Sequence, residues 1–472
     1  MRTAISSTES SLLPEGLRIR RPKRPPIWLG VVGLAGGGLV LGTVLAGAPP
    51  SAILGTVALL LAAGAAIYWP ALGLAILAFT YPYDLTTYAG PVKVTSSAAL
   101  IAVLVMVLVG RQFLPSPPPI RRTKLDIPVL LFAGASVLSL ASLTGNLSGQ
   151  LVGLVKAFGG FALFFIATQT VKELKDVLVV AGAVIATGFI QAVQTVIPFV
   201  NGAQAVSIDS RATGNLVDAN LFAGYLVLVI PLALALGFSL RERWTIVPTA
   251  AVALVFVAAL VGTLSRSGWL GLVVGTVVLW VLFEGRRWRI ACVTGAVAAS
   301  FVLLGAWGPI STRLGASDTG PLQMLSDRTE VWGAAIGMLR DHPLFGVGID
   351  TFQDFYPGYS GRDDGLNHAH NLFLNVAAER GIFGLLAFAA VTILLVGALI
   401  ERLKTSTSRT DRALIIGLFA AFAAYSVHSQ FDVSYYDYKV LLLFWLLVGL
   451  TISIGTTESP ASVSSVSRPA PK

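Results

Sequence analysis

A histidine and an asparagine stand side by side at the border between a long polar stretch and an apolar run. His370 precedes Asn371, and after nine further residues Gly381-x-x-Gly384 opens the apolar run. A histidine at a membrane surface can act as a general base near neutral pH, and small residues at this spacing let another helix approach closely. Because Asn367 can cap a first-turn N–H, the sequence predicts a helix that starts there and carries both His370 and Asn371.

Three arginines are also candidates for chemistry, two of them beside apolar runs. Arg266 follows Ser265 at the start of one run, Arg211 precedes another that begins after Asp218, and Arg328 lies in a long polar stretch. The planar guanidinium presents a fork of donors that suits phosphate oxygens. The plainer interpretation is that such arginines reach for lipid headgroups, and Asp218 is also an ordinary helix cap.

The elements that must position these residues are membrane spans. Hydrophobic residues make up 55% of the 472 residues, charged residues only 12%, and mean hydropathy is +0.78. Runs of about 20 apolar residues predict helices, because each helix satisfies its own backbone groups in lipid. The single cysteine, Cys292, excludes an internal disulfide and any multi-cysteine metal site.

The sequence therefore predicts an all-α polytopic membrane protein with about 14 transmembrane helices, within a range of 12–14. A single span over 52–82 would be about 46 Å long, more than the roughly 30 Å of a bilayer core, so a break is predicted at Trp69-Pro70. The predicted spans are 27–47, 52–68, 70–82, 94–113, 126–143, 150–170, 174–198, 219–239, 243–262, 266–284, 287–307, 381–400, 411–430 and 437–455.

Charge sets the expected orientation. With the N-terminus inside, cytoplasmic segments hold 23 Lys and Arg residues and external segments hold nine, which agrees with the positive-inside rule. The net charge of +9 thus reflects topology, and no nucleic-acid partner is expected. The predicted organisation is a basic tail (1–26), eleven spans (27–307), an external loop (308–380), three spans (381–455) and a disordered cytoplasmic tail (456–472).

The loop 308–380 is too long to be a simple connection. It holds five arginines and nine acids but no lysine. Asp327-x-x-Glu330 resembles a capping box, and the apolar residues that follow at helical spacing predict an amphipathic helix on the membrane, ending near His342-Pro343. The predicted apolar stripe consists of Trp332, Ala335, Ile336 and Leu339, with Arg328 on the first turn.

Other polar residues of this region are expected to be structural. On a helix, His368 and His370 would point about 160° apart, so no metal site is predicted. Glu379 would face away from His370 and is expected to be a surface carboxylate near Arg380, and His342 is expected to be a helix-end residue.

Further polar residues lie within a span or near the last two spans. Lys156 lies within a span, where a charge is expensive, and either lines a lipid groove or forms a structural ion pair. His428, Asp432, Tyr435 and Tyr436 are placed on the last external loop, with the tyrosines in an interfacial belt.

The sequence resembles the O-antigen ligase and O-antigen polymerase superfamily. That family carries a His, then Asn, Ser or Gln, then nine residues and G-x-x-G, as His370, Asn371, Gly381 and Gly384 do here. The segment from Asp327 to Phe352, DRTEVWGAAIGMLRDHPLFGVGIDTF, is similar to the family's Arg–Trp helix and Gly-rich turn, and Ser-Arg at 265–266 is similar to its span start.

The resemblance implies a glycosyltransferase that takes a glycan from a polyprenyl-diphosphate donor, inverts C1 and needs no metal or other cofactor. His370 would be the base, and Arg211, Arg266 and Arg328 would bind the diphosphate. The site would face the periplasm from the bacterial inner membrane, and the acceptor would be a glycan, lipid A-core or a protein. A transporter or flippase of lipid-linked glycans is the alternative, which would spread polar groups along a path through the bilayer.

Overall fold

The computed structural model describes residues 60–61, 63–84, 86–89, 92–142, 146–202, 210–240, 245–283, 321–362 and 365–455. The chain divides into two compact units, residues 1–64 and residues 65–472, and all that follows concerns the second. The predicted tails 1–26 and 456–472, the predicted spans 27–47 and 287–307, most of 52–68, and Cys292 lie outside the described residues.

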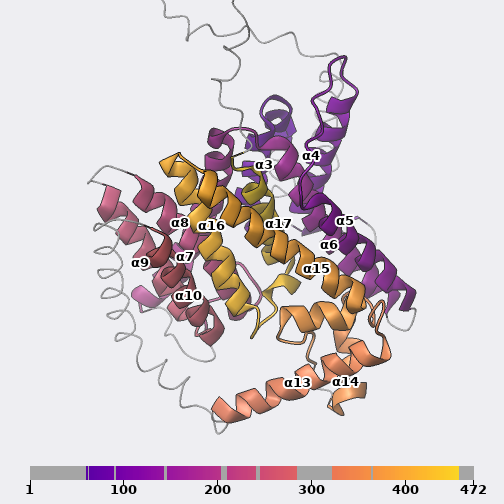
Figure 1. Cartoon of the computed structure of the whole chain (residues 1–472). Coiled ribbons are helices and arrows are strands. Elements are labelled where there is room, and N and C mark those ends of the chain that lie inside the picture. The colour runs from indigo at the N-terminus through magenta and orange to yellow at the C-terminus, as the bar shows by residue number, and fades with distance from the viewer. Residues whose placement is uncertain are drawn as a thin grey trace, which may run out of the picture. The chain divides into compact units, whose positions relative to one another are not determined.

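The described part is helical apart from one short hairpin (Figure 1). Strands β1 (Thr86–Ala89) and β2 (Val92–Thr95) pair antiparallel, which corrects the all-α prediction locally. The helices are α3 (Pro70–Thr80), α4 (Ser96–Gln112), α5 (Asp126–Leu138), α6 (Leu147–Thr170), α7 (Leu174–Val200), α8 (Ala219–Ser239), α9 (Ile246–Gly262), α10 (Arg266–Leu282), α13 (Pro321–Asp341), α14 (Phe352–Ser360), α15 (Leu372–Thr405), α16 (Arg409–His428) and α17 (Tyr438–Ser453), with short 3-10 turns η2 (Tyr81–Tyr83), η3 (Ser139–Ser142) and η5 (Ser434–Tyr436).

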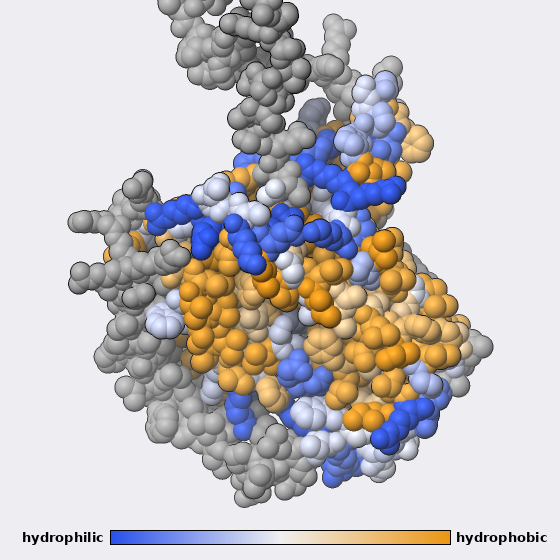
Figure 2. Space-filling view, viewed as in Figure 1, coloured by the Kyte–Doolittle hydropathy of each residue, from blue (hydrophilic) through white to orange (hydrophobic). Residues whose placement is uncertain are grey.

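The helices fit a membrane environment. Five of them in the described part, α6, α7, α8, α15 and α16, are long and apolar enough to cross a bilayer, and six shorter apolar helices accompany them. Figure 2 shows a broad hydrophobic zone on one face, bordered by hydrophilic residues at both ends. A polytopic membrane protein is therefore supported, while the number of 14 spans and the external position of 308–380 stay predictions.

Helix boundaries largely follow the sequence pattern. α8 occupies the predicted 219–239, and α7 begins at the predicted 174. The helix that precedes α3 ends at Tyr68, and the non-helical Trp69 is the N-cap of α3, which Pro70 begins. The break predicted at Trp69-Pro70 is thus confirmed.

Small residues bring the helices into close contact. A Cβ on Gly271 of α10 would lie 2.6 Å from the carbonyl oxygen of Ala424 in α16, and one on Gly160 of α6 would collide with the Trp445 indole of α17. Lipid is as apolar as leucine, so close van der Waals packing, rather than a hydrophobic force, holds such helices together.

The segment before α15 differs from its prediction. α13 begins at Pro321, six residues before the expected start at Asp327, although it ends at Asp341 as expected. Its buried residues are displaced from the predicted stripe: Trp332 is half-buried and Ile336 is exposed. The face that packs against α14 and α15 consists of Val331, Ala334, Ala335 and Met338.

A turn over residues 343–351 docks onto a break in α15. The backbone N–H of Val347 donates to Ala378 (2.9 Å) and that of Ile382 to Pro343 (2.8 Å). Gly381 has φ 62°, and a Cβ there would collide with the Leu344 carbonyl. The glycine at 381 therefore leaves room for this turn, and not for another helix as predicted. A Cβ on Gly384 would meet the Arg380 side chain of the same helix.

Candidate active site

The His370 loop, residues 365–371, leads into α15 but is not helical. Asn371 is the cap of α15, since its side chain accepts a hydrogen bond from the Leu374 N–H (3.1 Å). His370 has φ 51°, a left-handed conformation that a helix excludes, and the Ala369 N–H donates to Asn375 Oδ1 (2.9 Å). The prediction that Asn367 caps a helix carrying His370 was wrong, because the cap lies four residues later.

Without a helix, the two histidines of this loop converge. The ring centroids of His368 and His370 lie 4.4 Å apart, which contradicts the expected 160° divergence. His368 Nε2 donates to Asp432 Oδ1 (3.4 Å), while His368 Nδ1 forms a hydrogen bond with Asn367. Asp432 follows α16, so two loops some 60 residues apart in sequence build one cluster.

Burial and charge keep His370 unprotonated. Burial, aided by the nearby His368, lowers the pKa of His370 to about 4, although Asp432 opposes the shift. Burial alone would raise the pKa of Asp432, but its hydrogen bond with His368 and the surrounding histidines lower that pKa to about 2. At neutral pH the cluster thus holds a neutral His370 next to an ionised carboxylate.

Arg328 lies beside this cluster. It belongs to α13, and its guanidinium carbon lies 5.5 Å from the centroid of the Phe431 ring. Burial lowers the pKa of Arg328, and the neighbouring Asp432 partly offsets that shift. An arginine with so high an ordinary pKa stays charged, so the structure brings a cation together with His370 and Asp432. The sequence had assigned Arg328 and His370, but not Asp432, to one site.

Of the other two predicted arginines, Arg211 is hydrogen-bonded to the segment that leads to Arg266. Arg211 donates to the Thr263 carbonyl (2.7 Å) and to Asn220 Oδ1 (2.7 Å), and Thr263 lies three residues before Arg266. The N-cap of α10 is Ser265, which follows Leu264 in a left-handed conformation (φ 51°). Strained backbone of this kind is typical of functional sites.

The start of α10 packs against the end of α16. Gly271 of α10 lies against His428, the last residue of α16, and His428 is one turn before Asp432. His428 is fully buried, not on an external loop as predicted. The start of α10, with Arg266, therefore borders the same end of the bundle as the histidine cluster, and Arg211 is hydrogen-bonded to Thr263 just before it.

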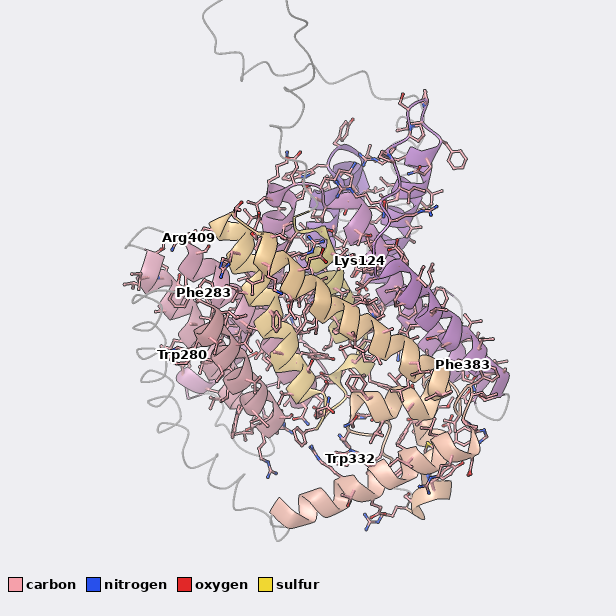
Figure 3. All side chains as sticks on the ribbon, in the orientation of Figure 1. Lys124, Trp280, Phe283, Trp332, Phe383 and Arg409 are labelled. Carbon is pink, nitrogen blue, oxygen red and sulfur yellow. The ribbon has the colours of Figure 1, made fainter. Side chains whose placement is uncertain are left out.

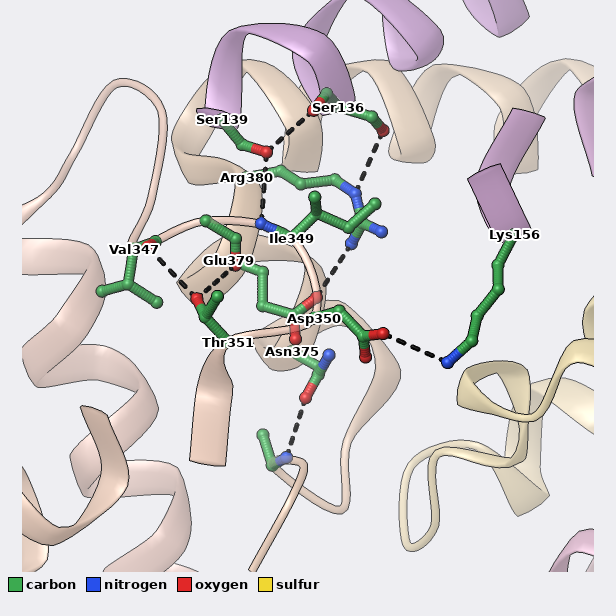
Figure 4. Close-up of polar contacts among 12 residues, drawn as sticks. Ser136, Ser139, Lys156, Val347, Ile349, Asp350, Thr351, Asn375, Glu379 and Arg380 are labelled. Carbon is green, nitrogen blue, oxygen red and sulfur yellow. Dashed lines mark hydrogen bonds and ion pairs between the residues drawn. The ribbon is translucent and has the colours of Figure 1, made fainter. Parts of the chain in front are cut away.

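Lys156 has a partner. Its ammonium lies 3.1 Å from Asp350 Oδ2 and 5.3 Å from the centroid of the Tyr436 ring. Of the two interpretations of Lys156, the structural ion pair is the one observed (Figure 4). Asp350 belongs to the turn that docks on α15, so this pair fastens that turn to α6.

Glu379 and Arg380 form a second, deeper pair. Their exposed fractions are only 2% and 6%, so the expectation of a surface carboxylate was wrong. Arg380 Nη1 lies 3.2 Å from Glu379 Oε2, and Arg380 Nε donates to Ser136 Oγ (3.1 Å). This buried pair joins α15 to α5 (Figure 4) and has a structural role.

The tyrosines after α16 do not form an interfacial belt. Tyr435 is buried and its hydroxyl accepts a hydrogen bond from Trp445 Nε1 (2.9 Å). The Tyr436 ring stacks on His368, with centroids 6.0 Å apart and planes 19° apart. Sequence reasoning missed His368 and Asp432 as site residues, and the only signal was the His-x-His spacing.

A metal ion could be considered at this cluster. The ligand atoms of His368, His370 and Asp432 lie within 4.8 Å of one another. The predicted divergence of the two histidines, which was the argument against a metal site, is therefore not present. The positive charge of Arg328 beside them opposes a cation. Metal independence stays a prediction.

The described residues enclose cavities on different sides of the bundle. A cavity of about 120 Å³ lies between α15 and α16 and starts at Leu372, two residues from His370; its walls are mostly apolar and aromatic. A larger one, about 930 Å³, is lined by Lys124, Glu401 and Arg402. Figure 3 shows Lys124 and Arg409 at the end of the bundle opposite Trp332, so the larger cavity lies away from the candidate site.

Comparison with known proteins places part of this architecture in a family. Residues 251–389 match a family model described as O-Antigen ligase. No curated protein matches the chain. The matched segment includes Arg266, Arg328, His370 and the two glycines of the motif, but neither Arg211 nor Asp432. Residues 251–389 are thus similar to the O-antigen ligase family, which supports the resemblance to the O-antigen ligase and polymerase superfamily.

Proposed function

We propose that this protein transfers a glycan from a polyprenyl-diphosphate donor to an acceptor hydroxyl, with inversion at C1 and without a metal. The family match supports a glycosyl-transfer role in polysaccharide biosynthesis. The observation that carries the finer proposal is the cluster of a neutral His370, the cation Arg328 and two nearby helix starts at one end of an apolar bundle.

His370 is the proposed base. The acceptor oxygen attacks C1 of the donor sugar, its proton passes to an imidazole nitrogen of His370, and the C1–O bond breaks with its electron pair leaving on the diphosphate. A base must be unprotonated to accept this proton, and His370, with its pKa lowered to about 4, is unprotonated at neutral pH.

Arg328, Arg266 and Arg211 are the proposed donor-binding residues. Negative charge grows on the diphosphate as it leaves, and fixed guanidinium groups stabilise that charge without a metal. The N-termini of α10 and α15, capped by the neutral residues Ser265 and Asn371, add positive dipole ends.

The surroundings suit a lipid-linked donor. The apolar cavity between α15 and α16 has Leu372, two residues after His370, in its wall and can take hydrocarbon from the bilayer. The proposed location is the bacterial inner membrane with the site on the periplasmic side, which the charge distribution supports. A glycan or lipid A-core is the proposed acceptor, and the residues of the site do not discriminate between them.

The test is transfer by purified protein in detergent, without an ion gradient. Polyprenyl-diphosphate glycan is mixed with either lipid A-core or a second lipid-linked glycan, and the products are resolved by mass spectrometry. We expect transfer to one acceptor and a loss of about 10²–10⁴-fold in His370→Ala, with donor binding retained. If the donor is not consumed with either acceptor, the proposed glycosyltransferase activity is refuted and a transporter is favoured.

A further inference from the structure

His370 lacks the partner that usually orients a basic histidine. In known catalytic histidines, a carboxylate or carbonyl bonded to Nδ1 fixes the ring and its tautomer. Here Nδ1 of His370 is buried and has no hydrogen-bond partner among the described residues. The orientation of the His370 ring must therefore come from packing, and the His368 ring, 4.4 Å away, is the aromatic group in contact with it.

His368 is itself held on several sides. One ring nitrogen of His368 forms a hydrogen bond with Asn367 and the other forms one with Asp432, while the Tyr436 ring stacks on the imidazole. Tyr436 in turn contacts Lys156, which is paired with Asp350. Asp432 and Tyr436 come from the segment between α16 and α17, so the ring of His368 is fixed by the fold and not by its own loop alone.

We propose that His368, held by Asp432 and Tyr436, is a positioning residue that keeps the His370 ring aimed at the acceptor hydroxyl. This inference rests on the proposed function, in which His370 is the base. His368 acts through its flat ring, because the contact with His370 is between two rings 50° apart and not a hydrogen bond.

The electrostatic surroundings are consistent with this role. The charged or titratable groups near His370 are His368 on its own loop, Arg328 on α13, Asp432 after α16, and Asp218 at the start of α8. His428 of α16 lies next to Asp432. Asp432 thus serves two purposes: it accepts the hydrogen bond from His368 and balances Arg328.

The variants distinguish packing of the His368 ring from coordination of a metal ion by its nitrogen atoms. His368→Ala removes the ring, His368→Phe keeps a flat ring but no nitrogen, and Asp432→Asn keeps an acceptor oxygen without charge. His342→Gln is the matched control, because His342 lies at the end of α13 with its ring near Phe355 (6.1 Å) and outside the cluster.

Steady-state transfer is measured for each variant. Since a misplaced catalytic group costs up to about 10²-fold, we expect His368→Ala to lower kcat by about 10–100-fold with the donor KM nearly unchanged. His368→Phe should recover most of that loss, Asp432→Asn should fall between the two, and His342→Gln should match wild type.

A readout independent of activity accompanies the kinetics. The chain has only four histidines, so the imidazole NMR signals of protein labelled at histidine are assignable with single variants. We expect the His370 signal to shift and broaden in His368→Ala, to return toward its wild-type position in His368→Phe, and to be unaffected in His342→Gln.

The outcomes separate this inference from the proposed function. If His370→Ala loses transfer while His368→Ala keeps wild-type kcat, the positioning role is refuted and the base remains. If His370→Ala is as active as wild type, the proposed base itself fails. If His368→Phe is as inactive as His368→Ala and a chelator abolishes wild-type transfer, the cluster holds a metal and the positioning role is overturned.

Discussion

The neutral state of His370 has a direct consequence for pH dependence. An unperturbed histidine titrates near about 6.5, but burial and His368 lower the pKa of His370 to about 4. The protonated form is inactive as a base, so activity is lost as pH falls through about 4 and is independent of this group above about 6.

Single-turnover transfer across pH 3.5–8 tests this expectation. The rate should not depend on the protonation of His370 from pH 6 to 8, should fall to about half near pH 4 and should fall further at pH 3.5. A midpoint near 6.5 in folded protein would show that His370 is more exposed to solvent than the structure has it. Circular dichroism at each pH provides the control for unfolding.

The arginines carry a second prediction at this scale. Arg266→Lys and Arg328→Lys keep the charge but lose the planar fork that binds two oxygens of a diphosphate. We expect each to lose most of the transfer activity and to bind donor more weakly while remaining folded. Near wild-type turnover in both variants would mean that these residues only anchor the protein at the membrane surface.

Single residues differed in how far the sequence could identify them. The spacing from His370 through Asn371 to Gly384 is local, so sequence alone could select it. Asp432 meets His368 only because α16 returns to the start of α15, and no local pattern signals such a contact. The sequence likewise leaves two interpretations of Lys156, because its partner Asp350 is 194 residues away along the chain.

At the scale of elements, apolar runs predicted helices well and irregular segments poorly. α8 has its predicted bounds, because burial of a long apolar run in lipid leaves few alternatives. The start of α15 was misplaced because Asn367 and Asn371 are both good caps, and the left-handed His370 decides between them. Capping preference alone cannot make that choice.

The turn docked on α15 can be tested by adding one methyl group. Gly381 has φ 62° and a Cβ there would meet the Leu344 carbonyl, so Gly381→Ala adds both strain and a collision. We expect a loss of at least about 1–3 kcal/mol, seen as a lower Tm in detergent. Gly397→Ala, at a helical site with nothing within 4 Å of a new Cβ, is the control and should be neutral or slightly stabilising. Equal Tm values for the two variants would contradict the docked turn.

At the scale of the whole molecule, the apolar zone and the charges give one orientation. Lys124 and Arg409 lie at one end of the bundle and Trp332 at the other (Figure 3), as the predicted spans require. Of the alternatives considered, a transporter would need polar groups through the bilayer. In the described residues, the titratable cluster of His368, His370 and Asp432 instead gathers at one end.

Topology is therefore the prediction on which every site assignment depends. Cytoplasmic segments are expected to hold 23 of the 33 basic residues and external segments nine. Reporters fused after Glu15, Pro118 and Thr407 should report the cytoplasm, and one fused after Asp318 should report the periplasm. Because Arg328 and His370 follow Asp318 without an intervening apolar run, they share its side of the membrane. A cytoplasmic signal at Asp318 would place the histidine cluster on the wrong side for a periplasmic donor and would remove the proposed function with it.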